Sequence, residues 1–443
     1  HICVFRSYML SWIVMTVLAG TLVMHEVNAG PIKVEIVGEQ GSYQLLRDGE
    51  PYVVRGAGTQ IAADLESLKR HGGNSVRTWN TDNPLLLDKA HELGITVSLC
   101  LDVRRERHGF DYDDPVAVQQ QLEAMKAEVL KYRDHPALLT WMIGNELNMD
   151  YHNPRVYDAV NDISKMIHEL DPFHPTTTAT AGMNAEMAGV ISSRAPDLDF
   201  ISVQVYGGLF QIKPVIEAID FDKPLMVTEW GTFGHWEVDK TSWGAPIELT
   251  SHEKAMTFQR GYEEIIRPLT GDLIGNYVFL WGYKQERTPT WYGLFTLDGK
   301  RTEAVDVMQQ IWTGAAPLNP GPRLDRVVLN GLTAESSIRL HPGEIYPAEV
   351  DAHARDELSY KWELMRESSA QQIGGDPEEI PEKLSGLIAD KSVQSSSLTT
   401  PIETGAYRLF VYVYDEQGGA AHANIPFYVV ADHEVGMEKR NVE

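Results

Sequence analysis

Residues 138–148 read Leu-Leu-Thr-Trp-Met-Ile-Gly-Asn-Glu-Leu-Asn, an apolar run that ends abruptly in polar side chains. The run is short, and it is rich in residues that favour strands, so we predict a buried strand over Leu138–Ile143. A glutamate, Glu146, then stands where a core residue would end the strand. A buried carboxylate is costly unless it has a partner or a chemical task, so Glu146 is the first candidate functional residue.

The same alternation of strand and helix extends on both sides of this segment. Short β-rich runs alternate with amphipathic helical patterns from Tyr52 to Trp312. The predicted helices include Asp64–His71, Leu85–Leu93, Val116–Tyr132 and Tyr157–Leu170. The eight predicted strands are Tyr52–Arg55, Ser75–Thr78, Ile95–Leu101, Leu138–Ile143, Thr176–Thr180, Phe200–Tyr206, Leu225–Thr228 and Ile274–Trp281.

Eight strands that alternate with helices over about 260 residues predict an α/β fold, a (β/α)8 TIM barrel. A doubly wound open sheet is the alternative. Its first strand usually leads into a glycine-rich turn, and we find no convincing one in this sequence. Ahead of the barrel, Ile32–Val37 and Tyr43–Arg47 predict a short hairpin that closes the bottom of the barrel.

A smaller all-β unit is predicted after the barrel. Residues 314–323 are rich in glycine and proline, as in a linker, and the helical period disappears beyond them. Alternating strands at 354–365, 405–414 and 423–430 predict a β-sandwich. We assign it to residues 324–432, with a polar loop at 371–395 and Trp362 in its core.

The first residues have the pattern of a secretory signal peptide. Arg6 precedes an apolar run, and small residues lie at Val27–Gly30, so residues 1–29 are predicted to be removed. A membrane anchor is the alternative, but the uncharged run Met9–Met24 is short for a span of about 20 residues. We therefore expect an exported chain, periplasmic or extracellular, without a membrane span after cleavage.

After cleavage, the barrel with its N-terminal hairpin would form one domain at residues 30–313, and the chain would end in a short tail at residues 433–443. Cleavage would also remove Cys3, so Cys100 would be the single cysteine of the mature chain. A nucleophilic role for Cys100 is possible in principle. Because Cys100 lies in an apolar predicted strand, we interpret it as a buried structural thiol.

Composition and charge limit the classes of partner. The chain has 38 Lys and Arg against 63 Asp and Glu, a net charge of −25. Such a surface repels phosphate, which argues against nucleic acids and dense polyanions and leaves neutral ligands possible. The proportions of 43% hydrophobic and 23% charged residues are those of a globular protein. The sequence does not indicate the oligomeric state.

Metal and cofactor motifs are not found. The sequence has no His-Glu-x-x-His, no cluster of Cys and His, and no glycine-rich loop that would cradle phosphate. The acidic stretch Asp111–Asp114 lacks the spacing of a calcium loop and is interpreted as a solvated start of a helix. We therefore expect no metal and no cofactor.

A second carboxylate ends the seventh predicted strand, where Val227-Thr228-Glu229-Trp230-Gly231 follows an apolar run. Strand ends form the functional face of a TIM barrel, so Glu146 and Glu229 would face one another. Such a pair can cleave glycosidic bonds, with one group as acid and the other as nucleophile or base. The simpler interpretation is that each glutamate only pairs with an arginine at the rim. It is disfavoured because two glutamates stand at the ends of two predicted strands.

These motifs resemble glycoside hydrolase clan A, most closely the TIM barrel domain of family 2. The resemblance spans roughly residues 43–312, but only some 20 residues lie between the predicted signal peptide and the barrel, where family 2 usually has two β-domains. That layout is closer to compact clan A glucanases and to the fungal family 72 glucanosyltransferases, which leaves substrate and acceptor open. The residues that carry the resemblance are Gly144–Glu146, Thr228–Gly231, Val54–Gly56, Asn74–Thr78 and Trp281.

The resemblance implies a retaining double displacement, with Glu146 as general acid/base and Glu229 as nucleophile. It also implies that Asn145 binds the sugar 2-hydroxyl and that Arg77 and Tyr206 hold the nucleophile. Flat indole rings bury the apolar faces of sugars, although core packing is the simpler role for any one tryptophan. The further candidate substrate-binding residues are Trp281, which the clan uses as a sugar platform, and Trp79, Asn80, Trp230 and Trp291.

Together these observations predict an exported retaining β-glycosidase that hydrolyses a neutral β-linked glucan or related oligosaccharide. A transglycosidase that uses the same two glutamates is the first alternative, and a non-catalytic glycan-binding barrel is the second. The C-terminal unit resembles the immunoglobulin-like or PKD-type modules of secreted carbohydrate enzymes. We expect it to be a spacer rather than a weak glycan binder. Asp102 and Arg104 are expected to form an ion pair at the rim or to bind hydroxyl groups.

Overall fold

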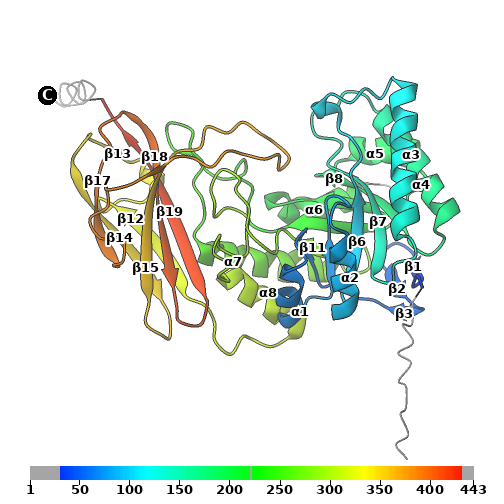
Figure 1. Ribbon diagram of the computed structural model, residues 1–443, viewed down its shortest axis with the longest axis horizontal. Helices are drawn as coiled ribbons and strands as arrows, with labels where there is room; N and C mark the ends of the chain where they lie inside the picture. Colours follow the sequence, from blue (N-terminus) through cyan, green and yellow to red (C-terminus); the bar gives the residue numbers. More distant parts are fainter. Residues whose placement is uncertain (1–29, 220–221, 432–443) are drawn as a thin grey trace, which may run out of the picture.

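The structure is a computed structural model that describes residues 30–219 and 222–431 (Figure 1). It contains a closed barrel of eight parallel strands followed by additional all-β sheets, which confirms the predicted barrel and an all-β C-terminal region. The predicted signal peptide, residues 1–29, and the predicted tail, residues 433–443, lie outside the described residues. In the part of the chain that is described, no helix is long and apolar enough to span a membrane.

The barrel strands follow one another around the ring in chain order, and each pair is parallel. Their carboxyl ends therefore meet at one face, where the two candidate glutamates lie. The strands are β4 (Gly56–Gly58), β5 (Ser75–Arg77), β6 (Thr96–Leu101), β7 (Leu138–Asn145), β8 (Thr176–Ala181), β9 (Ile201–Gln204), β10 (Leu225–Trp230) and β11 (Leu273–Val278).

The helices lie around the barrel, and four of them begin at a capping side chain or a first-turn proline. In the longest, the Asp114 side chain accepts hydrogen bonds from the amides of Val116 and Ala117, and Pro115 occupies the first turn. The helices are α1 (Asp64–Arg70), α2 (Pro84–Leu93), α3 (Pro115–Tyr132), α4 (Arg155–Leu170), α5 (Ala185–Arg194), α6 (Ile212–Ala218), α7 (Ser251–Arg260) and α8 (Glu303–Thr313). Shorter helical turns cover Glu106–His108, Gly207–Gln211, Gly261–Ile266, Arg267–Leu269 and Ala334–Ser336.

The first barrel strand is not where the sequence predicted it. Tyr52–Arg55 leads up to the barrel, and the pairing with β5 and β11 begins only at Gly56. A side chain at Gly56 would collide with the ring of Tyr277, which fills the barrel interior there. Strand propensity does not favour the sequence Gly-Ala-Gly. The strand has this sequence because the large neighbouring side chain leaves no space for a larger residue.

The N-terminal hairpin closes the amino-terminal end of the barrel, as predicted. Strands β1 (Val34–Val37) and β2 (Gln44–Arg47) pair antiparallel, and β3 (Glu50–Pro51) continues this sheet. Apolar side chains of the hairpin join a buried cluster with residues at the start of the barrel strands. The hairpin and barrel residues of this cluster are Val34, Leu45, Val54, Leu139, Phe200, Met226, Ile274 and Tyr277.

Two all-β sheets share one core after the barrel. The three-stranded sheet has the order β12-β14-β17, and the five-stranded sheet has the order β13-β19-β18-β15-β16. Trp362 is fully buried between them, as predicted, while the likeness to immunoglobulin or PKD modules stays a prediction. The strands are β12 (Arg323–Leu329), β13 (Arg339–Leu340), β14 (Ile345–His353), β15 (Ser359–Arg366), β16 (Lys383–Leu384), β17 (Ser395–Thr399), β18 (Gly405–Tyr414) and β19 (Ala420–Val429).

The sheets contact the barrel through buried polar groups. Glu248 accepts a hydrogen bond from Lys254 at 2.5 Å and another from Asn424 of β19 at 2.6 Å. Arg408 of β18 donates to the carbonyl of Pro246, and all these side chains are buried. Buried charges of this kind are destabilising unless they are fully paired, so the contact fixes one orientation of the sheets on the barrel.

We expect His422, at the same contact, to make folding stability depend on pH. Burial, followed by the Lys254 charge, lowers its pKa to about 3, whereas an unfolded histidine titrates near 6.5. The unfolded chain therefore binds one more proton as the pH falls from about 6.5 towards 3, and stability falls with it. His422→Gln should flatten that slope, measured by urea unfolding from pH 7 to pH 4. An unchanged slope would contradict this role for His422.

Candidate active site

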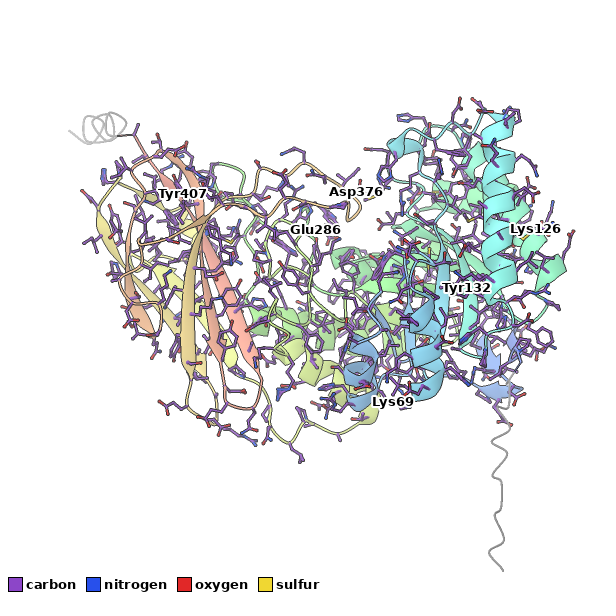
Figure 2. All side chains as sticks on the ribbon, viewed as in Figure 1. Lys69, Lys126, Tyr132, Glu286, Asp376 and Tyr407 are labelled. Atoms are coloured by element: carbon purple, nitrogen blue, oxygen red, sulfur yellow. The ribbon has the colours of Figure 1, made fainter. Side chains whose placement is uncertain are left out.

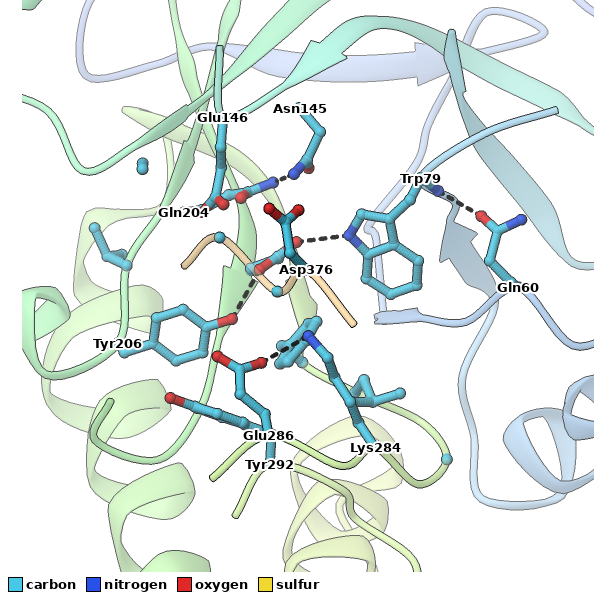
Figure 3. A pocket seen from close by; sticks show the side chains of 18 of the residues that line it. Gln60, Trp79, Asn145, Glu146, Gln204, Tyr206, Lys284, Glu286, Tyr292 and Asp376 are labelled. Atoms are coloured by element: carbon cyan, nitrogen blue, oxygen red, sulfur yellow. Dashed lines mark hydrogen bonds and ion pairs between the residues drawn. The ribbon is translucent and has the colours of Figure 1, made fainter. Parts of the chain in front are cut away.

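A cavity of about 690 Å³ opens at the carboxyl ends of the barrel strands, and Glu146 and Glu229 both line it (Figure 3). Glu146 follows β7, and Glu229 lies near the end of β10. Both side chains are buried, with 7% and 5% of their surfaces exposed. The two carboxylates that the sequence singled out are thus brought to one pocket.

Three donors surround the carboxylate of Glu229. Arg77 Nη1 lies 2.6 Å from Oε1, and Trp79 Nε1 donates to the same oxygen at 2.8 Å. The Tyr206 hydroxyl donates to Oε2 at 2.7 Å. Charge-assisted bonds of this kind stabilise the ionised carboxylate and fix its direction, as a nucleophile requires.

Arg77 also connects Glu229 to Asn145. Its Nη2 donates to Asn145 Oδ1 at 2.7 Å, and Gln204 Nε2 donates to the same oxygen at 2.7 Å. The amide nitrogen of Asn145 is therefore free to donate into the pocket that this residue lines. Gln204 was not among the predicted site residues, although a long polar side chain at the end of the predominantly apolar strand β9 was an available signal.

Glu146 is held by its backbone rather than by hydrogen bonds to its side chain. Its φ is 52°, and Gly144 has φ 78°, values that non-glycine residues rarely adopt. A Cβ at Gly144 would lie 2.6 Å from Leu147, so the turn requires glycine. Among the described residues, no hydrogen bond to the Glu146 carboxyl is found, and the group faces the pocket. Strained backbone of this kind concentrates at functional sites.

The environment of Glu146 favours its protonated form. Burial, followed by the negative charge of Glu229, raises the pKa of Glu146 above its ordinary range, and the charges of Arg77 and Arg107 only partly oppose this. Glu229, in contrast, is surrounded by donors. The two carboxyl groups are therefore in opposite environments, because Glu146 is buried without a hydrogen-bond donor among the described residues and Glu229 accepts three hydrogen bonds.

Two tryptophan predictions, Trp230 and Trp291, are not supported, because these rings are core residues that do not line the cavity. Trp281 does line the cavity, although its side chain is almost entirely covered and packs against Trp312 and Phe295, so its role as a sugar platform stays a prediction. Trp230 is also fully buried and donates to Asn276 at 3.0 Å. Trp291 is 1% exposed and donates to the carbonyl of Phe233, away from the cavity lining.

Other aromatic side chains form the wall of the cavity. Trp79, predicted as a subsite residue, lines it, and its ring meets Phe279 edge-on at 5.7 Å. Tyr206 contacts both Phe279 and Trp236. Trp236 is 52% exposed, which leaves a large apolar surface at the mouth. Neither Trp236 nor Phe279 was among the predicted site residues.

Two polar predictions at the rim also change. Asn80 does not line the cavity, and it instead accepts a hydrogen bond from Gln60 Nε2 at 2.7 Å. Gln60 in turn accepts from the backbone amide of Trp79 at 2.5 Å, so this pair positions the tryptophan (Figure 3). Asp102 pairs with Arg105 at 3.2 Å rather than with Arg104.

Cys100 is buried inside the barrel wall, as predicted. Burial raises the pKa of its thiol to about 12, so the reactive thiolate is not populated near neutral pH. This position therefore gives no support to a nucleophilic cysteine.

Three potential metal ligands gather elsewhere in the described chain. Ligand atoms of Asp325, Asp351 and His353 lie within 4.8 Å of one another on the C-terminal sheets. His353 Nε2 already contacts both carboxylates, at 3.1 Å and 3.4 Å. The group does not line the cavity, and an exposed ion pair accounts for it.

Comparison with known proteins finds similarity to glycosidases. Residues 55–235 match the TIM barrel domain of glycosyl hydrolases family 2. A beta-galactosidase of Vibrio cholerae is 24% identical over 218 residues, which are 45% of this chain and 20% of that protein. A beta-galactosidase of Bacteroides ovatus is 23% identical over 319 residues, which are 59% of this chain and 37% of that protein. These family 2 homologues are glycosidases.

The solved structures are similar in fold. Beta-glucuronidase 2 of Bacteroides uniformis superimposes with a TM-score of 0.52 at 15% identity, over 90% of this chain and 48% of that chain. This chain spans about a fifth or less of the length of the first curated relatives that it matches. The family 2 match covers barrel strands β4 to β10, and thus Glu146 and Glu229.

Proposed function

We propose that the protein is a retaining β-glycosidase that hydrolyses a neutral β-linked glucan or related oligosaccharide. The observation that carries this proposal is the opposite environment of two carboxyl groups in one pocket. Burial and a neighbouring charge favour a protonated Glu146, whereas Arg77, Trp79 and Tyr206 donate to Glu229. The similarity of the barrel to family 2 supports it. Export of the chain remains part of the proposal.

The reaction follows from these roles. Glu229 Oε2 or Oε1 attacks the anomeric carbon while Glu146 gives its proton to the leaving oxygen, which forms a glycosyl ester and releases the leaving sugar. Glu146, now ionised, takes a proton from water, and that water displaces Glu229 from the sugar. Two inversions leave the β configuration unchanged. The free amide nitrogen of Asn145 is placed to donate to the sugar beside the reacting carbon.

The charges around the cavity favour a neutral sugar over a uronic acid. Two cationic side chains, Lys284 and Arg105, line the cavity in the described chain. Lys284 already pairs with Glu286 at 2.6 Å, and Arg105 pairs with Asp102 at 3.2 Å. A substrate carboxylate would thus meet several carboxylates and no free cation among the lining residues, which is electrostatically unfavourable.

A panel of substrates tests the proposal. We expect the purified protein to hydrolyse a 4-nitrophenyl β-glucoside or β-galactoside, or a neutral β-glucan, and to act poorly on the β-glucuronide or β-galacturonide of the same sugar configuration. The two types of aryl glycoside differ only in the group at the sugar C5, so the ratio of their kcat/KM values measures the charge preference directly. A preference for the glucuronide would contradict a neutral substrate. Elongated products with little reducing sugar would identify transglycosylation instead of hydrolysis.

A further inference from the structure

We infer that residues 370–378, here termed the strap, complete the substrate pocket from the C-terminal sheets, with Asp376 as a specificity-determining residue for the leaving sugar. The strap belongs to the long connection between β15 and β16, which extends from the sheets to the barrel (Figure 1). Four of its residues, Gly374 to Pro377, line the same cavity as Glu146 and Glu229. The inference rests on the proposed glycosidase function.

The strap is clamped to the barrel rather than lying loosely over it. Arg287, in the loop after β11, donates from its guanidinium to the carbonyls of Ala370 and Gln372. Its backbone amide donates to Glu378 at 2.6 Å. Both ends of the strap are therefore attached to one barrel loop, which agrees with the fixed docking of the sheets.

Two glycines let the strap pass close to the barrel. A Cβ at Gly374 would lie 2.7 Å from Arg107 and 2.7 Å from Met149, which follows Glu146 by three residues. A Cβ at Gly375 would lie 2.6 Å from Lys284 on the opposite side. Both residues also have positive φ. A side chain at either position would have to displace the end of Arg107, Met149 or Lys284 and would adopt an unfavourable positive φ, so the close passage favours glycine.

Asp376 reaches the pocket from the strap and keeps its charge. Arg107 Nη2 lies 3.2 Å from one oxygen, and His108 Nε2 lies 2.9 Å from the other. Its side chain is 30% exposed, so both oxygens retain room for another donor. Figure 2 places Asp376 between the sheets and the barrel, and Figure 3 places it over the pocket. A sugar hydroxyl would donate a charge-assisted hydrogen bond to it.

The position of Asp376 assigns it to the leaving sugar. Arg107, which binds Asp376, also contacts the carbonyl oxygen of Glu146 at 3.5 Å. Glu146 must face the leaving oxygen, because it donates its proton there. Asp376 is thus linked through Arg107 to the side of the pocket where Glu146 meets the leaving sugar. Glu229 and its donors lie at the other side, where the sugar that is attacked would bind. The C-terminal sheets would then supply part of the active site, a role beyond the expected spacer.

Asp376→Ala separates this role from a structural one when two substrates with the same reacting sugar are compared. With a disaccharide, such as cellobiose or laminaribiose, we expect kcat/KM to fall roughly 10- to 100-fold, as for loss of a hydrogen bond to a charged group. With the 4-nitrophenyl β-glucoside, which lacks leaving-sugar hydroxyls, we expect little change. Asp376→Asn should lie between the wild type and Asp376→Ala.

Glu379→Ala is the matched control, because Glu379 is an exposed acidic residue beside the strap and makes no hydrogen bond or ion pair among the described residues. It should leave both substrates unaffected. Equal losses on both substrates in Asp376→Ala would contradict the inference and indicate a structural role. No loss on the disaccharide would also contradict it.

A wild-type protein that hydrolyses nothing would overturn the proposed function but not yet the inference. In that case the same disaccharides are titrated into the wild type and Asp376→Ala by calorimetry. Weaker binding to Asp376→Ala would support the role of the strap. Equal binding, or none to either protein, would contradict it.

Discussion

Replacing Glu229 by alanine is expected to lower kcat by roughly four to six orders of magnitude, as when a covalent nucleophile is removed. The carboxylate accepts three hydrogen bonds, and none of its neighbours can replace it as an attacking group. Azide should enter the space left by the side chain and restore turnover on an activated aryl glycoside. Because azide then attacks only once, the product should be the glycosyl azide of inverted, α configuration.

Glu146→Ala provides the matched comparison for that rescue. In this variant Glu229 still forms the glycosyl ester, and azide replaces water in the second step. The product should therefore be the β-glycosyl azide, the opposite of the Glu229→Ala product. The same azide configuration from both variants would contradict the assignment of the two roles. Circular dichroism of both variants checks the fold, because Glu229→Ala leaves the buried Arg77 without its carboxylate partner.

Glu146→Ala is itself expected to have a large effect that depends on the leaving group. For disaccharides, whose leaving alcohol needs a proton, kcat/KM should fall by about 10²- to 10⁴-fold. For a 2,4-dinitrophenyl glycoside, whose leaving group departs without protonation, the loss in kcat/KM should be small. Equal losses on both substrates would indicate that Glu146 is not the acid.

The pH dependence follows from the raised pKa of Glu146. The acid must be protonated at the start of the reaction, so kcat/KM should fall as the pH rises through that pKa. Burial and the charge of Glu229 raise it, so we expect activity near neutral pH, where an ordinary glutamate is already ionised. With the dinitrophenyl glycoside, Glu146→Ala should lose this alkaline limb. A limb that persists in the variant would belong to another group.

The barrel could be predicted because its strands and helices differ in hydrophobic period. β7 illustrates this, since the predicted Leu138–Ile143 lies within the observed Leu138–Asn145. The first strand was misplaced because Gly56 to Gly58 has no strand propensity, and its conformation depends on the packing of Tyr277. Tertiary contacts of this kind are not local in the sequence, so periodicity cannot reveal them.

Site residues could be predicted where they lie at the carboxyl end of a barrel strand, because that position directs the side chain towards the functional face. Glu146, Glu229, Arg77, Asn145 and Tyr206 all lie at such ends, and the structure brings them to one pocket. The tryptophans were harder, because indole rings suit both cores and sugar sites. Only the three-dimensional structure separates the two roles, because Trp230 and Trp291 are buried away from the cavity whereas Trp236 is exposed at its mouth.

The strap could not be predicted from local pattern at all. Residues 371–395 appeared only as a polar loop, and Asp376 lies 230 positions after Glu146 in the sequence. Its place over the pocket depends on how the sheets dock on the barrel through Glu248 and its partners. That contact is made by residues far apart in the chain, which a single sequence does not pair.

Trapping the covalent intermediate tests the central claim most directly. A 2-deoxy-2-fluoro β-glycosyl fluoride of the preferred sugar forms the glycosyl ester quickly and loses it slowly, because fluorine destabilises the positively charged transition states of both steps. Peptide mass spectrometry after brief acid digestion should place one sugar label on the peptide that contains Glu229, and specifically on Glu229. A label on any other residue, or inactivation without a covalent label, would contradict the proposed double displacement.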